Sequence, residues 1–247
     1  MKNKSLAPDT LLAPAEARPE QLSKRASERP RVSKLSPQKR KGRRGGARNS
    51  AMRQSHGLTD KQVLRLLQAT LNADQAGLPL NRMITLHWQH AGIRLDHMAK
   101  ATGRYLDLIS KAITRHDGHT AYIWTHENGP GKGGHCHILI HVPPRHVKRI
   151  TKLQRGWIEG ITKRPYKTRT VLSRSIGGRL GLESTAPDQH FANLDAALSY
   201  VIKGALPDVA ERFDMRRHEP GGLIIGKRCG MSQNVAPSQD RDHAIAS

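Results

Sequence analysis

Hydrophobic residues recur three or four positions apart in several stretches of the chain, and each such stretch predicts an amphipathic helix. The first helix is expected to begin at Thr59, because TDKQ places a hydroxyl N-cap three residues before Gln62. Its apolar positions then follow at Val63, Leu67 and Leu71. A second, longer helix is predicted to run to about His116, with an apolar stripe of Leu95, Met98, Ala99, Leu106, Ile109, Ala112 and Ile113.

A third helix follows Pro143 and Pro144, and its residues separate by face. One side carries the apolar residues Val147, Ile150, Leu153, Trp157, Ile158 and Ile161. The other side carries the cations Arg145, Lys148, Arg149, Lys152 and Arg155. No acid lies on that side between positions 145 and 158, so we expect this face to contact nucleic-acid phosphates rather than to be only a soluble surface.

Alternating or continuous apolar runs predict strands between these helices. The predicted strands are RMITLHW (82–88), TAYIWTHE (120–127) and HCHILIHV (135–142), with weaker candidates at TRTVLSRS (168–175) and GLIIGKRC (222–229). NGPGKGG joins the second and third strands into an antiparallel hairpin. A last helix, NLDAALSYVIKG, is expected to begin at an Asn193 cap and to stop at Gly204. This order predicts an α+β domain with a central antiparallel sheet of about five strands and helices packed on it.

Composition limits how much of the 247-residue chain can fold. Aromatic residues make up only 4% of it, and none of them precedes Trp88. The stretch before the first helix also lacks apolar periodicity, so it cannot bury enough surface to offset the entropy of ordering. We therefore predict a disordered basic tail over residues 1–56, one folded domain over 57–232 and a flexible C-terminal tail over 233–247.

The charge of the chain points to a polyanionic partner. The formal net charge is +22, and it is densest in QKRKGRRGGAR, residues 38–48. No apolar run approaches the length of a membrane span and the N-terminus lacks the apolar stretch of a signal peptide, so we expect nucleic acid rather than a membrane as partner. Cys136 and Cys229 are too few for a disulfide scaffold and fit a reducing cytoplasm.

Two histidines mark a candidate metal site. Alternation along HCHILIHV places His135 and His137 on one face of the strand, opposite the apolar set Cys136, Ile138, Ile140 and Val142. Residues two apart on a strand are about 6.6–6.8 Å from each other, a separation from which two imidazoles can converge on one ion. Glu127 ends the partner strand and can reach across as a third, oxygen ligand. This set suits Mg²⁺ or Mn²⁺ acting on a phosphate, with Zn²⁺ as the rival metal.

A candidate nucleophile lies on the last helix. Tyr200 and Lys203 are on the side away from its apolar stripe, about 60° apart. Core tyrosines usually lie within or beside such a stripe, so this placement indicates a phenol that acts chemically, supported by a cation that stabilises a phosphoryl transition state. Lys132, in the hairpin loop, is a further candidate for contact with DNA.

GGHCHILIHVP resembles the histidine-hydrophobic-histidine motif of the HUH endonucleases, and YVIK around Tyr200 is similar to the tyrosine helix of their rolling-circle replication initiators, the Rep proteins of plasmids and phages. MITLHW is similar to their first strand motif, GKRCGMS resembles a recurring segment of bacterial Rep-like proteins, and Glu127 matches the acidic ligand. The resemblance covers about residues 80–232 and implies a ferredoxin- or RRM-like sheet.

The resemblance also implies an activity: a metal held by Glu127, His135 and His137 polarises the scissile phosphate of single-stranded origin DNA, and Tyr200 attacks it to form a 5′-phosphotyrosine. Partners implied are a host helicase and DNA polymerase in the cytoplasm of a bacterium. Two alternatives stay open. One is a single-tyrosine transposase of the same superfamily, which also carries a histidine pair followed by a tyrosine on a helix. The other is a non-catalytic basic protein that binds DNA.

Overall fold

The computed structural model describes residues 52–116 and 118–237, all of which belong to the second of the two units into which the chain divides, residues 47–247. Most of the tail predicted over residues 1–56, and the end of the one predicted over 233–247, lie outside the described residues. Inside them, residues 54 and 55 form a short strand and Gln233–Val235 a short helical turn. Among the described residues, none of the helices is both long and apolar enough to cross a bilayer.

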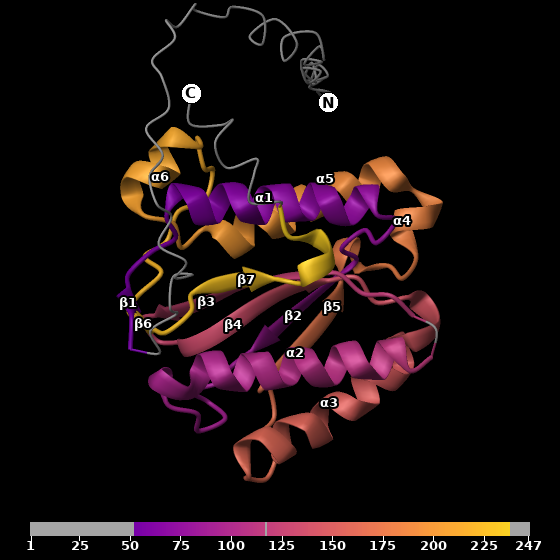
Figure 1. The fold of residues 1–247 in the computed structure, drawn as a ribbon, viewed down its shortest axis with the longest axis horizontal. Helices are drawn as coiled ribbons and strands as arrows, with labels where there is room; N and C mark the ends of the chain where they lie inside the picture. The colour runs from indigo at the N-terminus through magenta and orange to yellow at the C-terminus, as the bar shows by residue number, and fades with distance from the viewer. Residues whose placement is uncertain (1–51, 117, 238–247) are drawn as a thin grey trace, which may run out of the picture. The chain divides into compact units, whose positions relative to one another are not determined.

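The main elements agree in kind and order with the hydrophobic pattern (Figure 1). The strands are β1 (Gln54–Ser55), β2 (Arg82–Leu86), β3 (Tyr122–Gly129), β4 (Gly133–Ile140), β5 (Val171–Ser175), β6 (Ile224–Ile225) and β7 (Cys229–Met231). The α-helices are α1 (Asp60–Gln75), α2 (Met98–Thr114), α3 (Val147–Thr162), α4 (Leu182–Thr185), α5 (Pro187–Ile202) and α6 (Pro207–Arg212). The capping box predicted at Thr59 is present, with Gln62 accepting from the Thr59 backbone.

Five strands form one antiparallel sheet in the order β5-β2-β4-β3-β7, and β1 pairs with β6. The register sets Glu127 of β3 directly opposite His135 of β4. It also sets His137 between Thr85 of β2 and Thr125 of β3. The predicted α+β class, with an antiparallel sheet of five strands and helices packed on it, is confirmed; the finer likeness to ferredoxin- or RRM-like domains stays a prediction.

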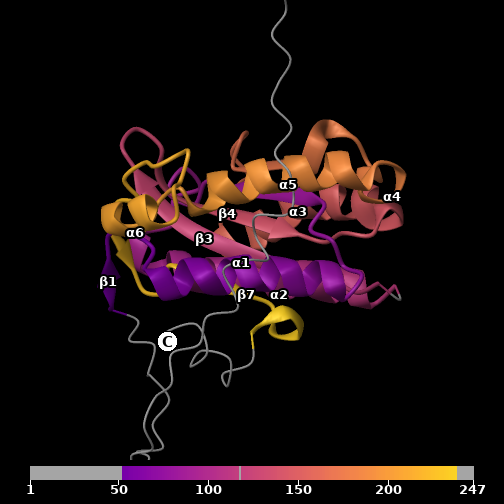
Figure 2. The same ribbon diagram turned by 90° about the horizontal axis from the view of Figure 1, so that it is seen from above.

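Helices cover both faces of the sheet, and each face has its own core. α1 and α5 lie side by side on one face (Figure 2), where they pack with Ile123 and Leu139. α2 and α3 cover the other face, where they pack with Ile138 and Ile140. Alternation along β4 therefore divides its side chains between the two cores, as a period of two requires. His135 and His137 share the face of Leu139, which is the face of α5.

The strands of the hairpin lie within two residues of their predicted bounds, but two other predictions are wrong. The last long helix begins at Pro187 rather than at Asn193, because proline fits the first helical position and Asp188 favours the positive end of the helix. Asn193 is inside this helix and its side chain donates to the Gln189 carbonyl. GLIIGKRC is not one strand either: Gly226, at φ 88°, turns the chain between β6, which pairs with β1, and β7, which pairs with β3.

Candidate metal centre and its tyrosine

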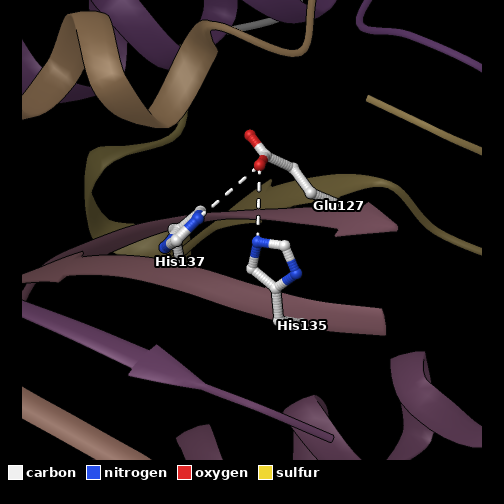
Figure 3. Close-up of side chains that lie close together, drawn as sticks. All are labelled: Glu127, His135 and His137. Carbon is white, nitrogen blue, oxygen red and sulfur yellow. Dashed lines mark ion pairs between the residues drawn. The ribbon is translucent and has the colours of Figure 1, made fainter. Parts of the chain in front are cut away.

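Three side chains with metal-ligating atoms converge on the α5 face of the sheet. Oε2 of Glu127 lies 3.4 Å from Nε2 of His135 and 3.6 Å from Nε2 of His137, and the carboxylate points from β3 across to the two rings on β4 (Figure 3). One ligand atom from each residue lies within 4.8 Å of the others. The structure thus brings together the three residues that the sequence singled out.

Hydrogen bonds to the outer ring nitrogens fix the orientation of both imidazoles. Nδ1 of His135 lies 2.7 Å from the Gly133 carbonyl oxygen, which can only accept, so Nδ1 carries the proton. In neutral His135 this leaves the lone pair on Nε2, the atom that faces Glu127. Nδ1 of His137 lies 3.0 Å from the Thr85 hydroxyl, which can hold the same tautomer.

The cluster is nearly closed to water and leaves polar atoms without a partner. The side chains of His135 and His137 are 2% exposed and that of Glu127 is 4% exposed. Nε2 of His137 and Oε1 of Glu127 have no hydrogen-bond partner among the residues that the structure describes. Buried polar atoms are usually paired, so the unpartnered Nε2 of His137, which faces the Glu127 carboxylate, indicates a place for a cation.

Charge states at neutral pH favour metal binding. Burial lowers the pKa of His137 to about 4, so its ring is neutral and keeps a lone pair. Burial alone would raise the pKa of Glu127, but His135, His137 and Lys203 around it outweigh that effect and hold the pKa well below its usual range. A carboxylate and two imidazole nitrogens are a donor set that fits a divalent cation and leaves positions for water or substrate oxygens.

Tyr200 reaches this cluster from α5. Its ring lies edge-on to the His137 ring, with 4.9 Å between the centroids and 74° between the planes. The side chain is partly buried, and its hydroxyl makes no hydrogen bond with any described residue. The helix therefore carries a phenol to the edge of the metal centre. Its apolar side, with Leu194, Leu198, Val201 and Ile202, packs in the core below as predicted.

Lys203 lies closer to the metal centre than the sequence suggested. Its ammonium is 5.1 Å from the centroid of the Tyr200 ring, so it is beside the phenol as expected. The residue is also 3% exposed, and the ammonium forms ion pairs with Glu127 and Glu219. A lysine assigned to an outward face is thus buried, because two carboxylates take up its charge.

Sequence reasoning missed three residues around the cluster. Arg217 lies with its guanidinium carbon 4.8 Å from the centroid of the Tyr200 ring, and it pairs with Glu219. Both residues follow α6 in a segment without periodicity, so no spacing could have identified them. His87 stacks on His135, with centroids 5.7 Å apart. It follows β2 directly, so a prediction that β2 pairs with β4 would have placed it beside His135.

GKRCGMS, to which no chemistry was assigned, has a structural role. Arg228 is 2% exposed, and its guanidinium donates to the backbone carbonyls of Ser55, His126, Gly221 and Gly222. Asn128 donates its backbone N–H to the Gly221 carbonyl, so Arg228 ties the chain beside Glu127 to the segment that follows Glu219. Arg228 therefore supports the metal centre without contacting it.

The predicted DNA-contact residues do not all lie near the metal centre. The cations of α3 and of the turn before it are exposed as expected: Arg145, Lys148, Arg149, Lys152 and Arg155. However, α3 covers the opposite face of the sheet from Tyr200 (Figure 1). Lys132 is exposed in the hairpin loop and close enough to His87 to lower the pKa of that ring, after the larger effects of burial, His135 and His90.

The arrangement provides a partly exposed phenol, three ligands for a cation and two further cations around one ring. These are the parts required to move a phosphoryl group to a tyrosine. No protein-family model, curated protein or solved structure matches the chain. The geometry of the site therefore carries the functional argument.

Proposed function

We propose that the protein is a metal-dependent endonuclease that nicks and rejoins single-stranded DNA and initiates rolling-circle replication. The observation that carries the proposal is the position of Tyr200, whose ring lies against His137 of the three-ligand cluster. A nucleophile held beside a cation site is the arrangement that phosphoryl transfer to a tyrosine requires. The resemblance of GGHCHILIHVP and YVIK to the HUH endonucleases supports the same reaction.

The proposed reaction moves one phosphodiester linkage from a DNA 3′-oxygen to the phenol. The Tyr200 oxygen attacks phosphorus and gives its proton to water, while the bond from phosphorus to the 3′-oxygen breaks. The 3′-oxygen takes up a proton and leaves as a hydroxyl that a polymerase can extend. Because the 5′-phosphotyrosine keeps a phosphodiester bond, the reverse reaction rejoins strands without ATP.

Glu127, His135 and His137 would hold Mg²⁺ or Mn²⁺, which supplies Lewis-acid stabilisation of charge on a phosphate oxygen. The chain adds cations of its own, because Lys203 and Arg217 lie 5.1 Å and 4.8 Å from the centroid of the Tyr200 ring. Fixed positive charge at this place stabilises the negative charge on the transferring phosphoryl group. Tyr200 supplies the attacking oxygen, and the packing of α5 on the sheet keeps it in place.

A replication initiator makes use of the free 3′-hydroxyl as a primer at an origin. We place the protein with a host DNA polymerase and helicase in the bacterial cytoplasm, and its net charge of +22 supports affinity for DNA. A single-tyrosine transposase is the second candidate, because positions one turn from Tyr200 on either side are Ala196 and Gly204. With one tyrosine on α5, a second strand transfer would require water or another subunit.

The test is covalent capture of DNA. A random-sequence single-stranded library labelled at its 3′ ends is incubated with the protein and Mn²⁺, because the 5′-phosphotyrosine retains the fragment that carries the 3′ end. We expect a labelled protein band that survives denaturation and a modified peptide that mass spectrometry assigns to Tyr200. Tyr200→Phe should abolish the band, whereas Tyr166→Phe should leave it.

The outcomes separate the candidate functions. An adduct on Tyr200 that requires Mn²⁺ supports nicking and joining, and sequencing of the captured fragments then gives the site. Cutting at the ends of a mobile element would favour the transposase. Cutting at a replication origin would favour the replication initiator. DNA binding without any adduct would leave only the non-catalytic DNA-binding protein.

A further inference from the structure

One oxygen atom of the metal centre already has a cation beside it. Oε2 of Glu127 is the atom that faces both imidazole nitrogens, and it is also the atom that the Lys203 ammonium contacts. The side chains of Lys203 and Glu127 are each 4% exposed, so water is largely excluded from this ion pair. The ammonium therefore already contacts the carboxylate oxygen that a divalent cation would bind.

Glu219 offers a second place for the same ammonium. Its Oε2 lies 3.1 Å from Nζ of Lys203, and its Oε1 lies 2.9 Å from the guanidinium of Arg217. The backbone N–H of Glu219 donates to the Lys203 carbonyl at 3.0 Å, which keeps the two residues adjacent. Glu219 is 40% exposed at its side chain, so it can adjust to a moving partner more easily than Glu127 can.

We propose that Lys203 is an internal cation that holds Glu127 until a divalent metal binds, and that Glu219 then receives the ammonium. The inference rests on the metal site of the proposed function. A divalent cation and an ammonium on one carboxylate oxygen repel each other strongly in a buried site. Transfer to Glu219 relieves this repulsion and keeps the positive charge beside the Tyr200 ring, where the transferred phosphoryl group would lie.

The proposal requires that two substitutions change metal affinity in opposite directions. In Lys203→Met the competing cation is gone, so Mn²⁺ should bind more tightly, by about tenfold. In Glu219→Gln the ammonium has no second carboxylate and stays on Glu127, so Mn²⁺ should bind about tenfold more weakly. Lys227→Met removes one exposed charge of the same domain and should leave the affinity within about threefold of the wild type.

Isothermal titration of the metal-free, full-length proteins with Mn²⁺ measures all four affinities without any DNA. Thermal melts in EDTA establish that each variant is folded. Should Lys203→Met not fold, the wild-type protein provides a second measurement: the ¹⁵N signal of the Lys203 ammonium should shift when Mg²⁺ is added, and this shift should be absent in Glu219→Gln.

The results separate this proposal from the metal site itself. If the wild type binds no Mn²⁺, the metal site of the proposed function is wrong. If the wild type binds Mn²⁺ and either variant equals it, or both change in the same direction, the metal site stands and the lysine exchange is overturned. Opposite changes with an unchanged Lys227→Met establish the exchange.

Discussion

The hydroxyl of Thr85 lies 3.0 Å from Nδ1 of His137, on the side of the ring away from Glu127. Thr85 and Thr125 are the two cross-strand neighbours of His137, one on each side. Thr85 hydrogen-bonds to the imidazole, whereas the hydroxyl of Thr125 donates to the Val201 carbonyl on α5. The two threonines are thus a matched pair in which one supports a ligand and the other supports the tyrosine helix.

Thr85→Val should weaken Mn²⁺ binding by about 10- to 100-fold, because loss of a hydrogen bond to the outer nitrogen frees the ring and its tautomer. Valine has nearly the same shape as threonine, so the sheet should persist. The measurement is isothermal titration of the metal-free protein. Thr125→Val is the control and should keep the affinity of the wild type. Equal affinities for both variants would show that the Thr85 hydroxyl does not orient His137.

The three metal ligands could be predicted from the sequence, because their geometry depends on the local periodicity of side chains along each strand. A strand period of two puts His135 and His137 on one face, and a short hairpin loop sets Glu127 opposite them. These relations involve neighbouring strands only. For the same reason the stripe of α5 predicted which side of that helix would carry Tyr200, although the start of the helix was placed at Asn193 and is at Pro187.

The residues around the ligands could not be predicted from the sequence, because their positions depend on tertiary contacts. Glu219 and Arg217 come from a loop after α6, and nothing in their spacing shows that the loop returns to α5. The burial of Lys203 follows from those contacts too. The cationic face of α3 was read correctly as exposed, but only the sheet order and the packing show that it lies across the sheet from Tyr200.

The α3 face should add to DNA affinity without affecting chemistry. Lys148→Gln with Lys152→Gln removes two exposed charges, so the salt dependence of binding to single-stranded DNA should fall by about 1.4 in the logarithmic slope. Because α3 lies on the face opposite Tyr200, the rate constant of adduct formation at saturating DNA should not change. Fluorescence anisotropy at several salt concentrations gives the slope, and single-turnover adduct formation gives the rate constant.

The charge-preserving variant, Lys148→Arg with Lys152→Arg, separates charge from shape and should retain the wild-type slope. An unchanged slope in the glutamine variant would show that the α3 face is only a soluble surface. A lower rate constant of adduct formation at saturating DNA would show that the α3 cations help to position DNA at Tyr200.

Arg228→Met should destabilise the fold by about 3 kcal/mol or more, because four backbone carbonyl groups, two of them in buried hydrogen bonds, lose a charged donor. Lys227→Met is the matched neighbour: its ammonium is exposed and lies 5.6 Å from the centroid of the Trp124 ring, a contact worth about 0.5–1 kcal/mol. Urea unfolding followed by circular dichroism measures both. Similar losses for the two variants would contradict the role assigned to Arg228.

Acid should destabilise the protein near pH 6 through His126. Nδ1 of this buried ring lies 2.8 Å from the Lys227 carbonyl oxygen and Nε2 lies 2.8 Å from the Thr102 hydroxyl, which itself accepts from Trp88. Burial lowers the pKa of His126 to about 3, against about 6.5 in an unfolded chain. Between these values the unfolded chain binds a proton that the native protein does not, so stability falls as pH decreases below 6.5.

From pH 7.5 to pH 5.5 the loss attributable to His126 should be about 1.4 kcal/mol of unfolding free energy. His137, whose pKa of about 4 is lowered by burial in the same direction, should add a similar loss when EDTA keeps metal away. Urea unfolding in EDTA at several pH values gives the total. His126→Asn cannot titrate, so it should be less stable at pH 7.5 but lose about 1.4 kcal/mol less than the wild type on acidification. Parallel pH profiles for the two proteins would mean that His126 becomes protonated inside the fold, and that the chain of hydrogen bonds from Trp88 to Lys227 does not hold the ring neutral.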